Sequence, residues 1–308
     1  MNAGSPSKWT ENDIPDLDGK VALITGSNAG LGLEAARTLA RHGARLILAC
    51  RNVAKAEEAA VRVEAAGGGR PVTVVPLDLA SLTSVAAAAK TVLDGEDRLD
   101  LLLNNAGLMG LDRSTTEEGF EMQFGVNHLG HFAFTAQLLP LLLATPGSRV
   151  VNQSSMGHRP GRLVVDDLMF ERRRYDRWRP YFQSKLANIL FTKELQRRLT
   201  EAGSDTMALA AHPGASHTDL GHEGSGITNT LLKVGVGAAQ SAEVGALPIV
   251  RAAVDPTAQG GQFYGPRFVF RGKHPVVETP SRRARNADDA RALWAKSEEL
   301  TGLTYVFG

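Results

Sequence analysis

The feature that most constrains the fold is a short apolar run that leads directly into a glycine-rich loop and then into a helical segment. The run reads KVALIT at 20–25, the loop reads GSNAGLG at 26–32, and helical spacing follows as far as Gly43. Glycines at such a turn let the backbone approach a pyrophosphate, and the helix N-terminus supplies free N–H groups and a positive dipole end. The spacing T-G-x-x-x-G-x-G differs from G-x-G-x-x-G, and a plain tight turn is the alternative. A first βα turn is nevertheless the context in which a glycine cluster binds a dinucleotide.

We therefore expect the loop to hold the phosphates of a dinucleotide. The residues assigned to that role are Gly26, Ser27, Asn28, Gly30, Leu31 and Gly32.

The same alternation of strand and helix continues along the chain. Strands are predicted at 20–25, 44–50, 71–78, 99–107, 148–155 and 206–214, and helices at 32–43, 53–67, 81–94, 117–145 and 181–203. The strands are apolar almost throughout, as expected when helices cover both faces of a parallel sheet. Strands and helices in turn form βαβ units and a doubly wound sheet. We therefore predict one α/β Rossmann domain at 19–308, with a mostly parallel seven-stranded sheet. A polar extension at 1–18 precedes it, and segments at about 156–178 and 215–240 are the expected substrate loops.

Bulk composition excludes several functional classes. The 308 residues carry a net charge of +1, which argues against nucleic acid or an anionic membrane as the main partner. Cys50 is the single cysteine, so intramolecular disulfides and multi-cysteine metal sites are excluded. The sequence shows no signal peptide and no run of about 18–20 apolar residues, so we expect a cytoplasmic protein without an integral membrane segment. His128, His131 and His212 are not spaced with acids as a metal site, and we interpret them as core or loop histidines.

The end of the second strand bears on which dinucleotide is bound. An acid about 20 residues past the glycines would hold the ribose 2′-hydroxyl of NAD, whereas an arginine there accommodates the 2′-phosphate of NADP. The strand ends in Ala49-Cys50-Arg51-Asn52, with no acid. The guanidinium fork of Arg51 matches phosphate oxygens, although an ordinary surface arginine is the alternative. NADP(H) is favoured, and NAD(H) remains open.

Two tyrosines in the stretch RRRYDRWRPYFQSK at 172–185 are each followed four residues later by a cation. Pro180 suits the first turn of a helix and disfavours helical dihedrals in the residue before it. We therefore expect the helix to start near Pro180 and to leave Tyr175 and Arg179 in the preceding loop. Tyr181 and Lys185 would lie on one face of the helix. A free phenol has a pKa of about 10, and a neighbouring ammonium together with an oxidised nicotinamide would lower it. Tyr181 is thus a candidate general acid/base.

Seven motifs together resemble the short-chain dehydrogenase/reductase family over about 20–280. They are TGSNAGLG, Asp78-Leu79, NNAG at 104–107, Asn127, VNQSS at 151–155, Tyr181-x-x-x-Lys185 and HPG at 212–214. FGVNHLGHF, YFQSKLANILF and LWAKSEELTG are most similar to its retinol dehydrogenase-like and WW-domain oxidoreductase-like branch. The resemblance implies Asn127, Ser155, Tyr181 and Lys185 as the catalytic set. It places the adenine at Asp78 and Leu79, the adenosine ribose at Asn105, Ala106 and Gly107, and the nicotinamide end at Pro213, Gly214 and Thr218. Lys185 would also hold the nicotinamide ribose beside Tyr181.

The expected function is an NADP(H)-dependent oxidoreductase that interconverts a carbonyl and an alcohol, with Tyr181 passing the proton. The apolar, glycine-rich composition of 215–240 suggests a fairly apolar small-molecule substrate. Two alternatives stay open: a C=C reductase similar to light-dependent protochlorophyllide reductase, and a non-catalytic NADP(H)-binding sensor or scaffold. The helices at 117–145 and 181–203 could pack in a homodimer, as in many relatives.

Overall fold

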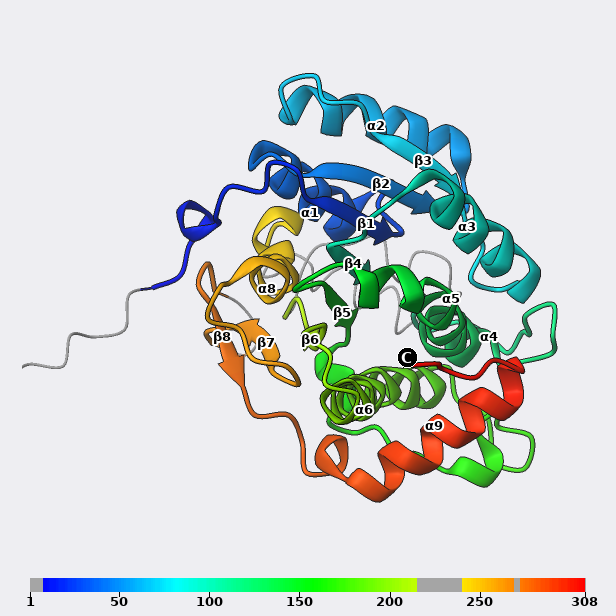
Figure 1. The fold of residues 1–308 in the computed structure, drawn as a ribbon. Coiled ribbons are helices and arrows are strands. Elements are labelled where there is room, and N and C mark those ends of the chain that lie inside the picture. Colours follow the sequence, from blue (N-terminus) through cyan, green and yellow to red (C-terminus); the bar gives the residue numbers. More distant parts are fainter. Residues whose placement is uncertain (1–7, 215–239, 269–271, 308) are drawn as a thin grey trace, which may run out of the picture.

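A single eight-stranded sheet forms the centre of the molecule. The computed structural model describes residues 8–214, 240–268 and 272–307. The strand order is β3-β2-β1-β4-β5-β6-β7-β8, in which every neighbouring pair is parallel except β7 and β8 (Figure 1). The strands are β1 Val21–Thr25, β2 Arg45–Cys50, β3 Thr73–Pro76, β4 Leu101–Asn104, β5 Arg149–Gln153, β6 Met207–Ala211, β7 Phe263–Pro266 and β8 Pro275–Glu278. The doubly wound α/β domain is confirmed. The expected strand number was one too low, because β8 is a four-residue antiparallel edge strand without a preceding helix.

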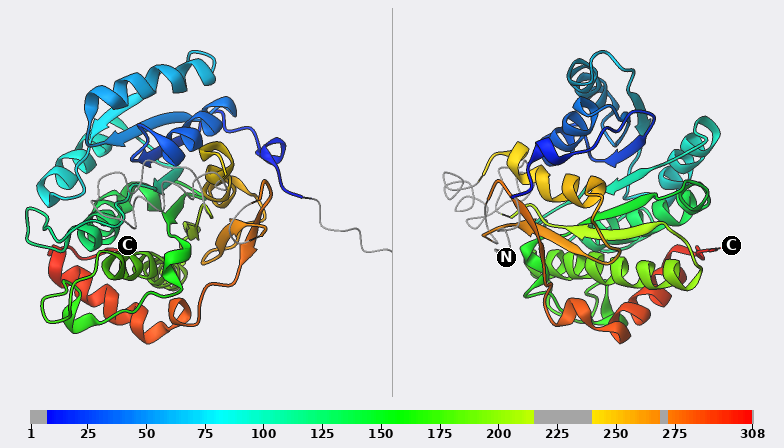
Figure 2. Two further views of the ribbon diagram at one scale, coloured as in Figure 1. Left: turned by 180° about the vertical axis from the view of Figure 1, so that it is seen from behind. Right: turned by 60° about the vertical axis from the view of Figure 1, so that its left-hand side comes forward.

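Helices cover both faces of the sheet, which explains the continuous apolar strands (Figure 2). On one face lie α1 Gly30–Arg41, α2 Val53–Ala66 and α8 Ala242–Val254; on the other lie α3 Leu82–Gly95, α5 Gly130–Ala144 and α6 Trp178–Glu201. Within β1, Ala22 and Ile24 pack toward the first group, and Val21 and Leu23 toward the second. Because β1 to β7 are all parallel, their carboxyl ends lie at one edge of the sheet, where the predicted site residues follow.

The long helix expected at 117–145 is divided. A short α4, Met122–Phe124, leads into a π-helical turn, Gly125–Leu129, and only then into α5. Residues 115–121 instead form a tight turn closed by an isolated bridge between Thr115 and Glu121. A Cβ on Gly130 would lie 2.5 Å from Leu79 O, so the helix passes very close to the loop after β3. The π-turn carries Asn127 at its centre.

Helix α6 begins earlier than the proline suggested. It starts at Trp178, so Pro180 lies in the first turn, where its missing N–H needs no helical partner. Arg179 is therefore in the helix and not in the preceding loop, which corrects the expectation. Tyr175 does precede the helix, as expected.

The C-terminal segment covers the outer side of α5 and α6. Helix α9, Ala287–Thr301, packs against α6, and the two run side by side in Figure 1. Trp294 lies edge-to-face on Phe132 with ring centroids 5.3 Å apart, and Tyr305 donates a 2.7 Å hydrogen bond to Phe132 O. The chain itself thus occupies part of the face proposed for a homodimer.

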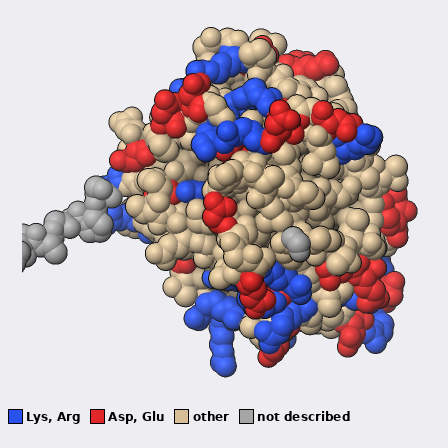
Figure 3. Space-filling view, in the orientation of Figure 1, with Lys and Arg blue, Asp and Glu red and all other residues tan. Residues whose placement is uncertain are grey.

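The surface carries charges of both signs, interspersed on the face seen in Figure 3. Within the expected N-terminal extension, Trp9, Ile14 and Leu17 are buried and pack on the core beside α1 and α8. Among the described helices, none has the length and apolar character that a membrane span requires.

Candidate active site

Tyr181 and Lys185 lie one turn apart on the buried face of α6, as their spacing predicts. Their exposed fractions are 7% and 5%. Lys185 Nζ donates a 3.3 Å hydrogen bond to Gln153 O at the end of β5 and lies 5.9 Å from the centroid of the Tyr181 ring. Ser155 follows the same strand, and its hydroxyl lies near enough to the Tyr181 phenol to lower the pKa of that phenol. Helix and strand therefore bring the three predicted groups together.

Burial dominates the protonation of this pair. It raises the pKa of Tyr181 above the usual value for a phenol, and the hydrogen bond from Ser155 opposes that rise. It also lowers the pKa of Lys185 to about 8, because a charged ammonium loses its hydration there. In the protein without a cofactor, burial therefore outweighs the lowering of the Tyr181 pKa that we expected from Lys185. At neutral pH Tyr181 keeps its proton and can donate it.

Asn127 joins the loop after β4 to α6. Its Oδ1 accepts from Leu108 N at 2.7 Å, and its Nδ2 donates to Leu108 O and to Ser184 Oγ, both at 2.9 Å. A Cβ on Gly107 would lie 3.1 Å from both Asn127 Oδ1 and Lys185 Nζ. Glycine at 107 thus lets the loop backbone approach the amide and the ammonium together.

Thr25 and His131 extend this arrangement, and the sequence did not single them out for the site. Thr25 Oγ1 lies 2.8 Å from His131 Nε2, and His131 Nδ1 donates to Asn127 O at 3.2 Å. His131 Nε2 then accepts the Thr25 hydroxyl proton, while Thr25 Oγ1 accepts from the amides of Asn105 and Ala106, each at 3.0 Å. Burial lowers the pKa of His131 to about 3, so it stays neutral. In the sequence, the position of His131 four residues after Asn127 was the one indication that the two residues lie on the same helix face.

The glycine loop fits an anionic ligand at the N-terminus of α1. Gly26 and Gly30 have φ of +64° and +55°, and a Cβ at Gly30 would meet no atom within 4 Å, so its outer side is open. The N-cap is Ala29, and the first turn of α1 contains no acid. Backbone N–H groups and the helix dipole therefore face this space without a competing cap, which suits a pyrophosphate.

Ser27 and Asn105, both predicted to contact the cofactor, direct their side chains into the protein. The Ser27 hydroxyl is fully buried and donates to Ile24 O at 3.0 Å, so only its backbone is placed for a ligand. Asn105 uses its side-chain amide to hold Thr25 O at 2.9 Å. A Cβ on Gly32 would come within 2.5 Å of that amide. Gly32 is therefore required by packing of the loop.

The remaining predicted cofactor residues follow the carboxyl ends of other strands. Arg51 is exposed directly after β2. Asp78 is half-buried after β3 and accepts from Ala80 N at 2.9 Å, and Leu79 beside it is buried. Pro213 and Gly214 follow β6, whereas Thr218 lies outside the described residues. All described members of the set share one edge of the sheet.

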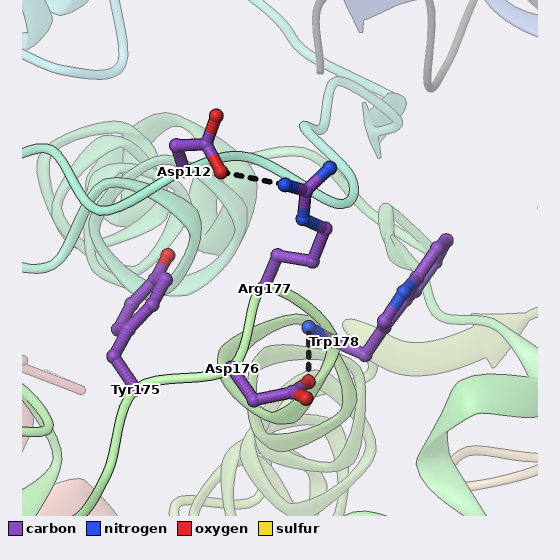
Figure 4. Close-up of a pocket in the computed structure, with 5 residues that line it drawn as sticks. All are labelled: Asp112, Tyr175, Asp176, Arg177 and Trp178. Atoms are coloured by element: carbon purple, nitrogen blue, oxygen red, sulfur yellow. Dashed lines mark hydrogen bonds and ion pairs between the residues drawn. The ribbon is translucent and has the colours of Figure 1, made fainter. Parts of the chain in front are cut away.

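Hydrogen bonds within the protein fix the side chain of Tyr175. Its hydroxyl lies 3.1 Å from both Leu111 O and Glu121 Oε1, and burial, aided by the Glu121 carboxylate, raises its pKa. It lines a hollow of about 350 Å³ with Asp112, Asp176, Arg177 and Trp178, where Arg177 pairs with Asp112 at 2.8 Å (Figure 4). The Trp178 ring stacks on the Phe182 ring, with centroids 6.2 Å apart. It lies edge-to-face to the Tyr181 ring, with centroids 6.4 Å apart. Trp178, the first residue of α6, thus lines the hollow and also lies beside Tyr181.

The other two histidines also have their own partners. His128 Nε2 lies 2.9 Å from Ser297 Oγ on α9, and His212 Nε2 lies 3.2 Å from Glu278 Oε1. Among the residues that the structure describes, no three His, Cys, Asp or Glu side chains gather as a metal site.

Comparison with known proteins matches residues 20–225 to the model of the short chain dehydrogenase family. Human retinol dehydrogenase 13 is 41% identical over 97% of this chain and 87% of the relative, and human retinol dehydrogenase 12 is 40% identical over 94% and 88%. The crystal structure of an uncharacterized protein from Mycobacterium paratuberculosis is 45% identical, with a TM-score of 0.82 over 97% of this chain and all of that one. A short chain dehydrogenase from Shigella flexneri complexed with NADP is 25% identical, with a TM-score of 0.65 over 81% and 98%.

Proposed function

Since the chain belongs to the short-chain dehydrogenase/reductase family, in its retinol dehydrogenase-like branch, we propose an NADP(H)-dependent oxidoreductase in which Tyr181 is the general acid/base. Oxidoreduction of CH–OH and C=O groups follows from the family. The dinucleotide preference, the residue roles and the apolar substrate are the proposal. The observation that carries it is the meeting of Ser155, Tyr181 and Lys185 beside Gly107.

Each side chain has a defined task in this proposal. The bound nicotinamide would supply or accept the hydride at carbon. The Ser155 hydroxyl holds the substrate oxygen, and Tyr181 donates its proton to that oxygen during reduction or takes it back during oxidation. Lys185 stabilises the phenolate that remains. Asn127 binds Leu108 and so holds the loop that contains Gly107 in place beside Lys185.

The cofactor would lie along the carboxyl edge of the sheet. The open N-terminus of α1 suits the pyrophosphate, and Arg51 with no acid beside it suits a 2′-phosphate. The Shigella flexneri structure, which contains NADP, is consistent with this preference. The relatives are named for retinol, an apolar alcohol, so retinoids are the first substrate class to examine. The cytoplasmic location expected from the sequence stays a prediction.

The test compares Tyr181→Phe with Tyr175→Phe on retinoids, steroids, and aliphatic and aromatic aldehydes, using NADPH and NADH. Loss of the acid/base should lower kcat by roughly 10²–10⁴-fold for Tyr181→Phe. Tyr175→Phe removes the hydroxyl of the other tyrosine in the same stretch and should leave kcat within about threefold of wild type. Wild-type turnover by Tyr181→Phe would contradict the assignment. Reduction of C=C bonds alone, or dinucleotide binding with no turnover of any substrate, would favour one of the two alternatives.

A further inference from the structure

A buried polar chain runs from the edge strand β8 to the loop that leaves β6. His212 follows β6 and is fully buried, with Nε2 3.2 Å from Glu278 Oε1 on β8. The amide of Gly214 lies 3.2 Å from His212 Nδ1. Since a backbone amide can only donate, Nδ1 must accept, and Nε2 must carry the ring proton. Glu278 accepts a hydrogen bond from His212 Nε2–H. It therefore favours the tautomer in which Nδ1 can accept from the Gly214 amide.

The surrounding packing leaves room for this pair and for nothing larger. A Cβ on Gly265 of β7 would overlap both His212 Nε2 and Glu278 Oε1. Phe263, two residues earlier, stacks on the His212 ring with centroids 5.2 Å apart and an interplanar angle of 28°. The His212 side chain is fully buried and that of Glu278 is 11% exposed, so water has little access to replace a lost hydrogen bond between them.

The turn that His212 holds requires a glycine and is anchored by a second hydrogen bond. Gly214 has φ +68°, in the left-handed region, and Pro213 O accepts from Gln240 Nε2 at 2.7 Å. Gln240 in turn accepts from Gly272 N at 2.9 Å, in the connection between β7 and β8. The β7–β8 region thus contacts this turn through two independent routes.

We propose that Glu278 is a positioning residue for the nicotinamide end of the cofactor site. By accepting from His212 Nε2 it keeps Nδ1 as the acceptor for Gly214 N–H and fixes the turn Pro213–Gly214. Without Glu278, the ring can take the other tautomer, whose Nδ1–H faces the Gly214 N–H, and two donors repel. This inference rests on the proposed function, in which Pro213 and Gly214 border the nicotinamide.

The first test compares Glu278→Ala with Glu278→Gln and with Val277→Ala, an exposed neighbour on the same strand. NADPH and NADH affinities come from fluorescence titration, and KM and kcat from turnover of an accepted substrate. Glu278→Ala should weaken dinucleotide binding about tenfold, the effect of about 1.4 kcal/mol, and should raise the cofactor KM more than it lowers kcat. Glu278→Gln keeps an oxygen acceptor and should restore affinity to within about threefold. Wild-type affinity in Glu278→Ala, or equal losses in both variants, would overturn the proposal.

A second measurement needs no ligand and remains usable if Glu278→Ala folds poorly. His212→Asn places an oxygen near the Nδ1 position, whereas His212→Gln places its amide near Nε2 and loses the acceptor for Gly214. Hydrogen exchange of the Gly214 amide in the ligand-free protein should therefore accelerate in His212→Gln and stay near wild type in His212→Asn. Equal exchange in the two variants counts against the proposal. Failure of the proposed function would appear separately, as turnover by Tyr181→Phe or as wild-type protein that binds neither dinucleotide.

Discussion

Replacing Lys185 by methionine should stabilise the ligand-free protein while abolishing its activity. Lys185 is 5% exposed, and burial lowers its pKa from 10.5 to about 8. One pKa unit corresponds to about 1.4 kcal/mol, so keeping this ammonium charged inside the fold costs roughly 3 kcal/mol at neutral pH. Methionine has a similar length and no charge. The hydrogen bond from Lys185 to Gln153 O is lost, and this reduces the expected gain to about 2 kcal/mol.

The sign of the pH dependence follows from the same shift. Below pH 8 the lysine is protonated in both the folded and the unfolded chain, and the cost is present in full. Between about pH 8 and 10.5 the folded protein has released the proton and the unfolded chain still binds it. The free energy of unfolding of the wild type therefore rises with pH across this window. The advantage of Lys185→Met should shrink accordingly.

The assay is urea denaturation of wild type and Lys185→Met at pH 7.0 and pH 9.5 without dinucleotide. Lys90→Met is the control, because Lys90 is exposed on α3 and pairs with the exposed Asp94, four residues later. It should change stability by less than about 0.5 kcal/mol at either pH. A Lys185→Met protein that is no more stable than wild type at pH 7.0, or whose advantage does not depend on pH, would refute the reasoning.

Two further changes test other parts of the structure. Arg51→Glu should lower the ratio of NADPH to NADH affinity by at least tenfold, because a carboxylate repels a 2′-phosphate and can accept from a 2′-hydroxyl; an unchanged ratio in binding titrations would remove Arg51 from the cofactor site. The cover of α9 over α5 and α6 predicts a mass of one chain in light scattering, and Trp294→Ala should cost about 3–5 kcal/mol of unfolding free energy because a fully buried indole is removed. A stable dimer that the Trp294→Ala change disrupts would show that this face pairs between chains.

Local patterns predicted those parts of the site that depend on neighbours in the sequence. The turn around Gly26 and Gly30 follows from a strand, two left-handed glycines and a helix start within a few residues. The pairing of Tyr181 with Lys185 follows from the helical repeat alone. The start of α6 at Trp178 was missed because proline is excluded from a helix interior but tolerated throughout the first turn.

Contacts between distant segments could not be read from the sequence. His212 and Glu278 are 66 residues apart, and only the sheet order brings β6, β7 and β8 together. Thr25 and His131 are 106 apart, and each alone reads as a strand-end threonine or a core histidine. The π-turn at Asn127 likewise follows from no repeat in the sequence.

Burial is also what separates the two tyrosines chemically, and it has different consequences for each. Tyr175 is fixed by Glu121 and Leu111, and burial and the Glu121 carboxylate raise its pKa, so Tyr175 stays neutral without any ligand. Tyr181 has Ser155 beside its hydroxyl, and Lys185 Nζ lies 5.9 Å from the centroid of its ring. A positive nicotinamide at the neighbouring sheet edge would add the charge that favours its phenolate. Burial thus keeps Tyr181 protonated in the ligand-free protein. In the proposed mechanism Tyr181 also keeps its proton beside a neutral, reduced nicotinamide, and an oxidised, positive ring favours the phenolate.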